Sequence, residues 1–328
     1  MSELAARLRD GDLTAAPAVL NLVESRRPEA RVQTAELLAA LSPAALGGEA
    51  TGHVIGVTGP PGVGKSSLLS RLIAEWRSRG RSVAVLAVDP SSRRSGGSLL
   101  GDRARIERDP ADRSIFIRST AAGDRLGGLA PATRAAAAAL AVAFDIVVIE
   151  TVGVGQSETE VADVADSVAV IVQPGSGDVL QFLKSGIMEI PDLLVVTKAD
   201  LGRVADRALA DLRAALRSLG SQTAVIAVSS VAPATGIGDL ADALERHRET
   251  LDLAARRTRS RRMHALADFA AEYGERGLRA VGGRRAAEKR LAAEPGGSDV
   301  ATLQAVLVAA AGEAAGHGAG AGADLPAS

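Results

Sequence analysis

The feature that most constrains the fold of this 328-residue chain is a glycine-rich octapeptide that matches the pattern G-x-x-x-x-G-K-[ST]. It consists of Gly59, Pro60, Pro61, Gly62, Val63, Gly64, Lys65 and Ser66. In such a P-loop, backbone N–H groups surround phosphate oxygens, the lysine reaches the β- and γ-phosphates, and the hydroxyl binds Mg²⁺. The alternative is a glycine-rich turn without a ligand. An apolar run before the loop and a helical pattern after it favour a nucleotide site that extends to Ser67.

Short apolar runs alternate with helical segments along the middle of the chain. They lie at residues 54–57, 83–88, 115–117, 146–149, 168–172, 193–196 and 225–228. Continuous apolar strands between helices predict an α/β fold with a doubly wound, mostly parallel sheet that helices cover on both faces. Ligands of such sheets bind at the carboxyl ends of the strands.

Helical patterns lie on either side of this region. We predict an N-terminal helical segment at 1–50, a P-loop domain at 51–244, a C-terminal helical arm at 245–311 and a disordered tail at 312–328. The arm contains an arginine-rich run at 256–262, which we expect to be a solvated helix face rather than a binding patch. It also carries apolar residues that need a partner surface, most simply a second copy of the chain: Leu251, Leu253, Met263, Leu266 and Phe269.

Composition excludes several classes of protein. Aromatic residues make up only 2% of a chain that is 47% hydrophobic, so the core must consist of Ala, Val, Leu and Ile. The absence of cysteine excludes disulfides, thiolate zinc sites and cysteine nucleophiles. A net charge of -1 argues against a nucleic-acid partner. No secretory signal is visible, and the longest apolar run, at 135–144, is too short to cross a membrane, so we expect a cytoplasmic protein.

Three candidate acidic residues lie in segments that follow predicted strands. Asp89 ends the second apolar run, where it can act on Mg²⁺ through water or orient the hydrolytic water; a strand-terminal turn is the alternative. Asp102 lies in a glycine-rich segment at 96–103 that resembles a switch, although a surface loop would look similar. Glu150 and Gly153 form an acidic-x-x-Gly arrangement, with a carboxylate near Mg²⁺ and an N–H that senses the γ-phosphate.

The residue after Gly153 is Val154, where a Ras-like GTPase has a glutamine that positions water. Gln156 lies two residues further on and could serve only if the loop rearranges. We therefore expect slow unassisted hydrolysis.

A candidate base site follows two later strands. Residues 197–200 resemble the Asn-Lys-x-Asp guanine motif, with Thr197 in first place and with Lys198 and Asp200 matching. The carboxylate of Asp200 can accept from both N1–H and the exocyclic amine of guanine, a donor pair that adenine lacks. After the last predicted strand, a loop occupies the place that gives N–H groups to guanine O6; its residues are Ser229, Ser230 and Val231.

These segments together resemble the MeaB/ArgK-type GTPases, the accessory proteins of methylmalonyl-CoA mutase. The resemblance covers about residues 50–245 and rests on 59–67, 88–92, 96–103, 150–158 and 197–200. The 150–158 segment is the most specific, because most GTPases begin this motif with Asp. The sequence departs from the family at Thr197, where Asn is usual, and at Val231, where Ala is usual.

The resemblance implies a homodimer formed by the C-terminal arm, GTP with Mg²⁺, and a chaperone that loads or protects the adenosylcobalamin of an acyl-CoA mutase. It implies that Ser66, Asp89, Asp102 and Glu150 surround Mg²⁺ and water, with Lys65 as a P-loop contact. Residues 175–186, which include Lys184, resemble an additional switch segment of the family, so Lys184 joins the expected catalytic set.

Three alternatives remain open. A metallochaperone GTPase for another metalloenzyme should carry Cys or clustered His, whereas the four histidines here are scattered and are most simply surface or helix residues. A small-molecule kinase would not need Asp200 at the base. A scaffold that only binds nucleotide would not need the acidic residues.

Overall fold

The computed structural model describes residues 3–89, 106–121, 129–151, 157–175 and 191–319. Contacts divide the chain into two compact units. The sheet unit comprises Ala6–Arg31 and Thr51–Leu251, and the arm unit comprises Met1–Ala5, Val32–Ala50 and Asp252–Ser328. Within the described ranges, no helix combines the length and the apolar character needed to cross a bilayer.

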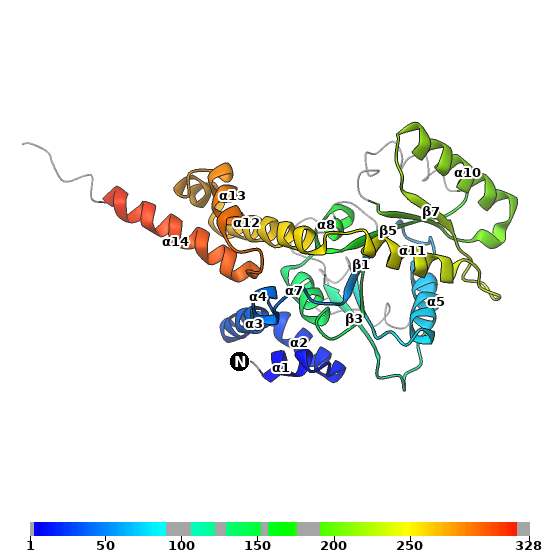
Figure 1. Ribbon diagram of the computed structural model, residues 1–328, viewed down its shortest axis with the longest axis horizontal. Helices are drawn as coiled ribbons and strands as arrows, with labels where there is room; N and C mark the ends of the chain where they lie inside the picture. The colour runs from blue at the N-terminus through cyan, green and yellow to red at the C-terminus, as the bar shows by residue number, and fades with distance from the viewer. Residues whose placement is uncertain (1–2, 90–105, 122–128, 152–156, 176–190, 320–328) are drawn as a thin grey trace, which may run out of the picture. The chain divides into compact units, whose positions relative to one another are not determined.

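A seven-stranded sheet forms the centre of the sheet unit in the described part of the chain (Figure 1). Its strands are β1 His53–Thr58, β2 Val83–Asp89, β3 Ile115–Ala121, β4 Ile146–Thr151, β5 Ser167–Val172, β6 Leu193–Val196 and β7 Ala224–Ala227. The order is β3-β2-β4-β1-β5-β6-β7, and every neighbouring pair is parallel. The predicted α/β fold is therefore confirmed, and β1, which leads into the P-loop, lies between β4 and β5.

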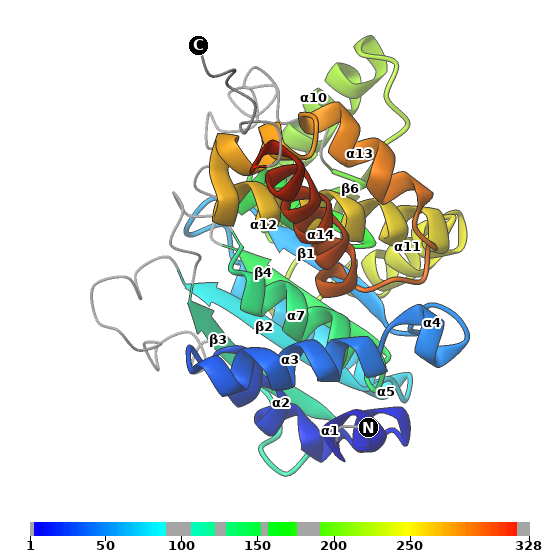
Figure 2. The ribbon, with the colours of Figure 1, turned by 90° about the vertical axis from the view of Figure 1, so that its left-hand side faces the viewer.

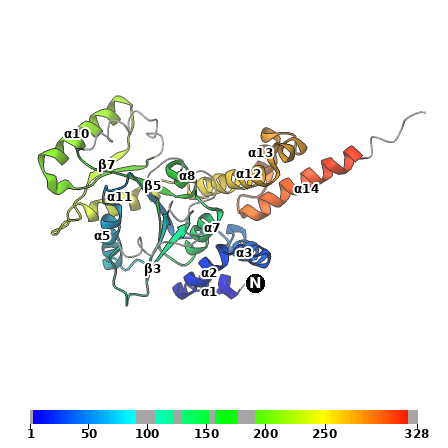
Figure 3. The same ribbon diagram turned by 180° about the vertical axis from the view of Figure 1, so that it is seen from behind.

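Helices cover both faces of this sheet. On one face, α5 (Lys65–Ser78) and α11 (Ile237–Glu249) lie side by side (Figure 3) and bury Leu69 and Leu240 in one cluster with Ile55 and Val57 of β1. Successive residues of a strand point to opposite faces, so Gly56 faces the other way, where a Cβ would lie 2.7 Å from Val161 of α8 (Ser157–Val164).

The second face is also covered by α7 (Pro131–Leu140), which packs on β2 and β4 (Figure 2). Pro131 at the start of this helix and the alanines after it favour helix formation. Among the described residues, the sheet unit also contains η1 Leu13–Ala15, α2 Ala16–Val23, which packs on α7, η3 Ala199–Leu201 and α10 Arg203–Ser218, which packs on β6 and β7. Helices α1 (Glu3–Arg9) and α3 (Pro28–Ala40) cross the boundaries between the units.

The arm unit has its own small apolar core. It is built by α12 (Leu253–Ala280), α13 (Arg284–Ala293) and α14 (Val300–Ala319), and the short helix α4 (Pro43–Leu46) belongs to the same unit. Leu266 and Phe269 of α12 are buried in one cluster with Leu291 of α13 and Leu303 and Leu307 of α14. The expectation that Leu266 and Phe269 lack a partner within the chain is therefore wrong: α13 and α14 cover them.

The arginine-rich run lies in the N-terminal half of α12 and binds its own unit. Arg261 donates to both carboxylate oxygens of Glu49, at 3.0 and 2.6 Å, and Arg257 donates to the carbonyl of Ala50 at 2.6 Å. Arg262 donates to the carbonyl of Glu294 at 2.8 Å, at the end of α13. A solvated face is thus the wrong interpretation for these three arginines, because groups distant in sequence accept their N–H groups.

Helix α14 continues to Ala319, past residue 312, where a disordered tail was expected. Alanine is the strongest helix former, so this composition sustains a helix without an amphipathic pattern. Residues 320–328 lie outside the described part of the chain. The predicted domain division at residues 50, 244 and 311 stays a prediction.

Candidate nucleotide-binding site

The P-loop joins β1 to α5 at the carboxyl edge of the sheet. Gly59 has φ +150°, and a Cβ there would lie 2.2 Å from the carbonyl oxygen of Ile171 in β5, so only glycine fits. Gly64 is the N-cap of α5 and has φ +94°. Since Gly64 has no side chain to cap them, the first N–H groups of α5 remain available to an anion.

Lys65 is the first residue of α5, and its side chain bends back over the loop. It is only 7% exposed, and Nζ donates to the carbonyl oxygens of Gly59 at 2.5 Å and Pro60 at 3.0 Å. Pro60 and Pro61 have no N–H of their own, so the start of the loop offers carbonyl acceptors and its later part offers N–H donors. This arrangement holds the ammonium group over the loop that is predicted to bind the phosphates.

Ser66 and Glu150 bring two oxygen ligands together at the start of α5. Ser66 Oγ lies 3.5 Å from Oε1 of Glu150, which is 9% exposed and stands opposite Val57 in the register of β1 and β4. Oxygen ligands of octahedral Mg²⁺ lie about 3 Å apart, so this pair fits one magnesium ion. The described residues contain no cluster of three His, Cys, Asp or Glu side chains that could hold a metal. Mg²⁺ in nucleotide sites commonly keeps phosphate oxygens and water among its ligands, and Asp89 and Asp102 stay predicted members of the set around the ion.

Four other predicted residues are beyond what the structure describes. The backbone of Asp89 ends β2, but its side chain is outside the described part, and Asp102, Gly153 and Lys184 fall entirely outside it. Their predicted roles stay predictions.

The predicted base residues gather in two neighbouring loops that follow β6 and β7. Asp200 lies in η3, and its Oδ1 accepts from the hydroxyl of Ser229 at 2.7 Å. The same hydroxyl oxygen accepts from the N–H of Val231 at 3.2 Å, while the Val231 side chain is 61% exposed. Ser229 therefore connects the carboxylate of Asp200 to the backbone that would face guanine O6.

The base loop, residues 197–200, also contacts the P-loop. Thr197 Oγ1 donates to the carbonyl of Val63 at 2.7 Å, and Lys198 Nζ donates to the carbonyl of Gly62 at 3.3 Å. The structure thus brings the predicted phosphate and base residues to one edge of the sheet, at the carboxyl ends of β1, β4, β6 and β7.

Two contacts in this region were not foreseen. Arg71 of α5 donates to the carbonyl of Ser230 at 3.0 Å, and Gln173, which directly follows β5, accepts from Lys198. The position of Gln173 after an apolar strand was a usable signal, because polar residues at strand ends line such sites. No local pattern marks Arg71.

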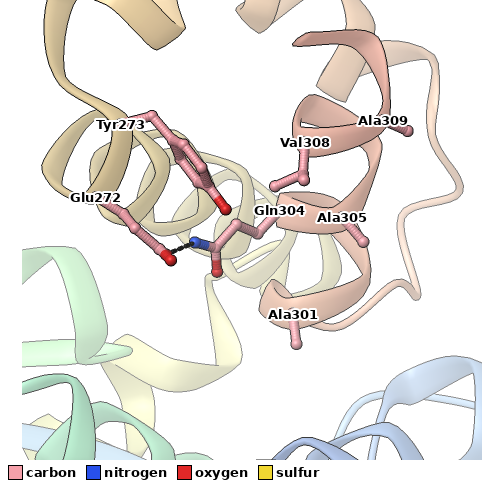
Figure 4. Close-up of a pocket in the computed structure, with 7 residues that line it drawn as sticks. All are labelled: Glu272, Tyr273, Ala301, Gln304, Ala305, Val308 and Ala309. Atoms are coloured by element: carbon pink, nitrogen blue, oxygen red, sulfur yellow. Dashed lines mark hydrogen bonds between the residues drawn. The ribbon is translucent and has the colours of Figure 1, made fainter. Parts of the chain in front are cut away.

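A separate hollow of about 460 Å³ lies in the arm unit (Figure 4). It is lined by α12 and α14, with Tyr273 and Val308 facing it, and Glu272 accepts a 3.0 Å hydrogen bond from Gln304 beside it. None of the residues of the P-loop or the base loop lines it.

Comparison with known proteins identifies the family of the chain. The family model of the methylmalonyl Co-A mutase-associated GTPase MeaB matches residues 16–276. The chain belongs to the MeaB family. The resemblance seen in the sequence is confirmed, and the protein is a GTPase that binds GTP.

Several known proteins and one solved structure are similar to this chain over long stretches. A probable GTPase of Mycobacterium bovis is 41% identical over 255 residues, 76% of this chain and 75% of the relative. A protein of Caenorhabditis elegans, named methylmalonic aciduria type A homolog, mitochondrial, is 42% identical over 201 residues, 59% of this chain and 50% of the relative. The crystal structure of a LAO/AO transport system kinase matches with a TM-score of 0.61 and 26% identity, and covers 96% of both chains.

Proposed function

We propose that this MeaB-family GTPase is a chaperone of an adenosylcobalamin-dependent acyl-CoA mutase, methylmalonyl-CoA mutase or a close relative, and that it loads or protects the cofactor. One observation carries the proposal: the family model that matches 16–276 is that of a mutase-associated GTPase. The name of the Caenorhabditis elegans relative is in keeping with it.

Each group of the site has a role in this proposal. Lys65 exchanges the carbonyls of Gly59 and Pro60 for the β- and γ-phosphates, and Asp200 accepts the guanine donors. Mg²⁺, bound by Ser66 and Glu150, would neutralise phosphate charge. Asp89 and Asp102 complete the proposed acidic set around Mg²⁺ and water, and they belong with Lys184 to the proposed catalytic set. Gly153 is the proposed sensor of the γ-phosphate.

The decisive experiment compares GTP turnover with and without candidate mutases at matched nucleotide and Mg²⁺. Because Val154 replaces the water-positioning glutamine, we expect slow turnover by the protein alone and an acceleration of at least about tenfold by the cognate mutase. Lys65→Ala serves as the inactive control in both arms. Fast turnover alone, with no response to any acyl-CoA mutase, would contradict the chaperone role and leave the GTPase assignment intact.

The magnesium site has its own test. Glu150→Gln keeps the side-chain size but removes the charge next to Ser66. The Mg²⁺ concentration for half-maximal hydrolysis should rise about tenfold, which corresponds to about 1.4 kcal/mol. An unchanged Mg²⁺ titration would remove Glu150 from the metal site.

We also propose that the arm mediates a homodimer. Tyr273 and Val308, 41% and 38% exposed, present apolar surface beside the hollow between α12 and α14.

The variant with both Tyr273→Glu and Val308→Glu should be monomeric by light scattering at micromolar concentration. Leu219→Glu, an exposed apolar position in the sheet unit, is the matched control. Truncation after about Asp242 is less informative, because it removes the buried Leu244 of α11. A monomeric unmodified protein would contradict the proposal.

A further inference from the structure

Arg71, in the second turn of α5, reaches the loop that follows β7. The Nε–H of Arg71 donates to the carbonyl oxygen of Ser230 at 3.0 Å, across 159 positions of the chain. Arg71 is exposed, and ordering a long exposed side chain costs conformational entropy. A hydrogen bond from a charged donor offsets that cost better than a neutral one. The contact therefore joins the helix that begins at the P-loop to the loop that is predicted to face guanine O6.

The β7 loop, residues 229–235, is closed at its base by its own backbone. The N–H of Ser229 donates to the carbonyl of Thr235 at 3.0 Å, and the N–H of Thr235 donates to the carbonyl of Ser229 at 3.1 Å. Ser229 is 3% exposed, whereas Val231 is 61% exposed. The two backbone hydrogen bonds fix the ends of the loop, and Arg71 adds a contact to the peptide that joins Ser230 to Val231.

The carbonyl of Ser230 and the N–H of Val231 belong to this one peptide group. The peptide is trans, so it is planar and its C=O and N–H point in opposite directions. By holding the carbonyl, the guanidinium of Arg71 keeps the N–H of Val231 on the opposite side of the peptide. That N–H lies 3.2 Å from Oγ of Ser229, which is long for a hydrogen bond of this kind. It is therefore available to a better acceptor.

We propose that Arg71 is a positioning residue for base recognition, which orients the N–H of Val231 toward O6 of guanine and strengthens it as a donor. The strengthening follows from polarisation, because a cation at the carbonyl draws electron density from the N–H of the same peptide. The inference rests on the nucleotide site proposed above. It divides base recognition into two contacts, since Asp200 would accept from N1–H and the amine while the Val231 N–H would bind O6.

Nucleotides that lack one group of the base separate these two contacts. Inosine triphosphate keeps O6 and lacks the amine, whereas 2-aminopurine riboside triphosphate keeps the amine and lacks O6. Both carry the same triphosphate as GTP, so a change at the phosphate site affects all three ligands equally. Loss of the Arg71 contact should weaken GTP and inosine triphosphate by the same factor and leave 2-aminopurine riboside triphosphate unchanged.

The test measures the three affinities by competition with a fluorescent GTP analogue, using the full-length protein and its variants. Arg71→Met keeps a long apolar stem and removes the donors. We expect it to bind GTP and inosine triphosphate about fivefold more weakly, or by about 1 kcal/mol. Arg71→Lys keeps a cationic donor on a flexible stem and should lose less than about twofold. Arg71→Gln keeps a donor without the charge and should be intermediate.

The control is Arg217→Ala, which removes an exposed arginine from the last turn of α10. It should bind all three ligands as the unmodified protein does. Arg71→Ala replaces Arg71→Met if that variant does not fold, and should give the same pattern.

Three results would overturn the inference. Unchanged GTP affinity in Arg71→Met would show that the hydrogen bond to Ser230 does not matter for the base. An equal loss for 2-aminopurine riboside triphosphate would assign Arg71 to the phosphate site or to the fold. A loss in Arg71→Lys as large as that in Arg71→Met would indicate a packing role. Failure of the unmodified protein to bind GTP would instead contradict the proposed nucleotide site itself, so the two failures are distinguishable.

Discussion

The hydroxyl of Ser229 donates a 2.7 Å hydrogen bond to Oδ1 of Asp200, although the two residues follow different strands of the sheet. This hydrogen bond fixes the orientation of the carboxylate. Each of its two oxygens keeps a lone pair for a donor of the base. The loop after β7 therefore orients the residue that would select guanine in the loop after β6.

We predict that Asp200→Asn weakens GTP binding and raises the affinity for xanthosine triphosphate relative to GTP. The amide oxygen can keep the bond to Ser229, which turns the NH₂ group toward the donors of guanine; xanthine carries a carbonyl in place of the amine. The loss for GTP should be at least about tenfold, or about 1.4 kcal/mol. Competition titrations with a fluorescent nucleotide measure both affinities, and Ser229→Ala should give a smaller loss without the change in preference. Equal competition by ATP and GTP in the unmodified protein would contradict guanine recognition.

Lys65→Ala should reduce the affinity for GTP by at least about tenfold, or about 1.4 kcal/mol. The substitution removes the buried ammonium group that donates to the carbonyl oxygens of Gly59 and Pro60, and alanine carries no charge to take its place. Isothermal titration of GTP into the folded variant measures the loss. Lys289→Ala, an exposed lysine of α13, is the control and should bind normally. Unchanged affinity in Lys65→Ala would remove the phosphate site from this loop.

Much of this fold could be predicted from local patterns, because the strands are continuous apolar runs and the P-loop is a contiguous motif. The contacts of Arg261 with Glu49 and of Leu266 with α13 and α14 could not be predicted, since their partners are distant in sequence. His53 shows the same limit. It was expected at the surface or on a helix, but it begins β1 and is 1% exposed. A single polar residue beside a strand carries no local sign that another strand will bury it.

Stability at acidic pH should depend on Asp145, which directly precedes β4. Burial alone would raise its pKa, but hydrogen bonds from the N–H and hydroxyl of Ser82 and the charge of Arg81 outweigh burial, so the pKa is lowered. A lowered folded-state pKa stabilises the fold above the unfolded value of about 3.9, and this contribution is lost as the pH falls through the folded-state pKa. Asp145→Asn should therefore be less stable than the unmodified protein at pH 7, with the difference shrinking below about pH 4.

Urea unfolding at several pH values between about 3 and 7 measures this difference. Asp211→Asn, at an exposed position of α10, is the control and should not reproduce the pH trend. A difference that stays constant from neutral to acidic pH would contradict the role assigned to the Asp145 charge.

At the opposite edge of the sheet, the buried Ser167 joins two histidines in a chain of hydrogen bonds. Its hydroxyl lies 2.8 Å from Nε2 of His53 and 2.7 Å from Nδ1 of His247, and Nε2 of His247 lies 3.3 Å from Oδ1 of Asp192. We predict that neutral His247 carries its proton on Nε2, facing Asp192, so that Nδ1 accepts from Ser167 and the Ser167 oxygen accepts from His53 Nε2–H. The other carboxylate oxygen of Asp192 accepts the N–H of Val168, which connects the chain to β5.

Ser167→Ala should therefore destabilise the protein by about 1–3 kcal/mol, because it removes the one group that both rings share in a buried position. GTP affinity should be unchanged, since the P-loop lies at the carboxyl ends of the strands and Ser167 begins β5. Urea unfolding measures the loss, with the exposed Ser78→Ala on α5 as control. Nitrogen NMR of the histidine rings gives an independent measurement and should find the proton of neutral His53 on Nε2. A variant as stable as the unmodified protein would contradict the stabilising role of Ser167. A His53 ring protonated only on Nδ1 would contradict the predicted direction of the hydrogen bonds.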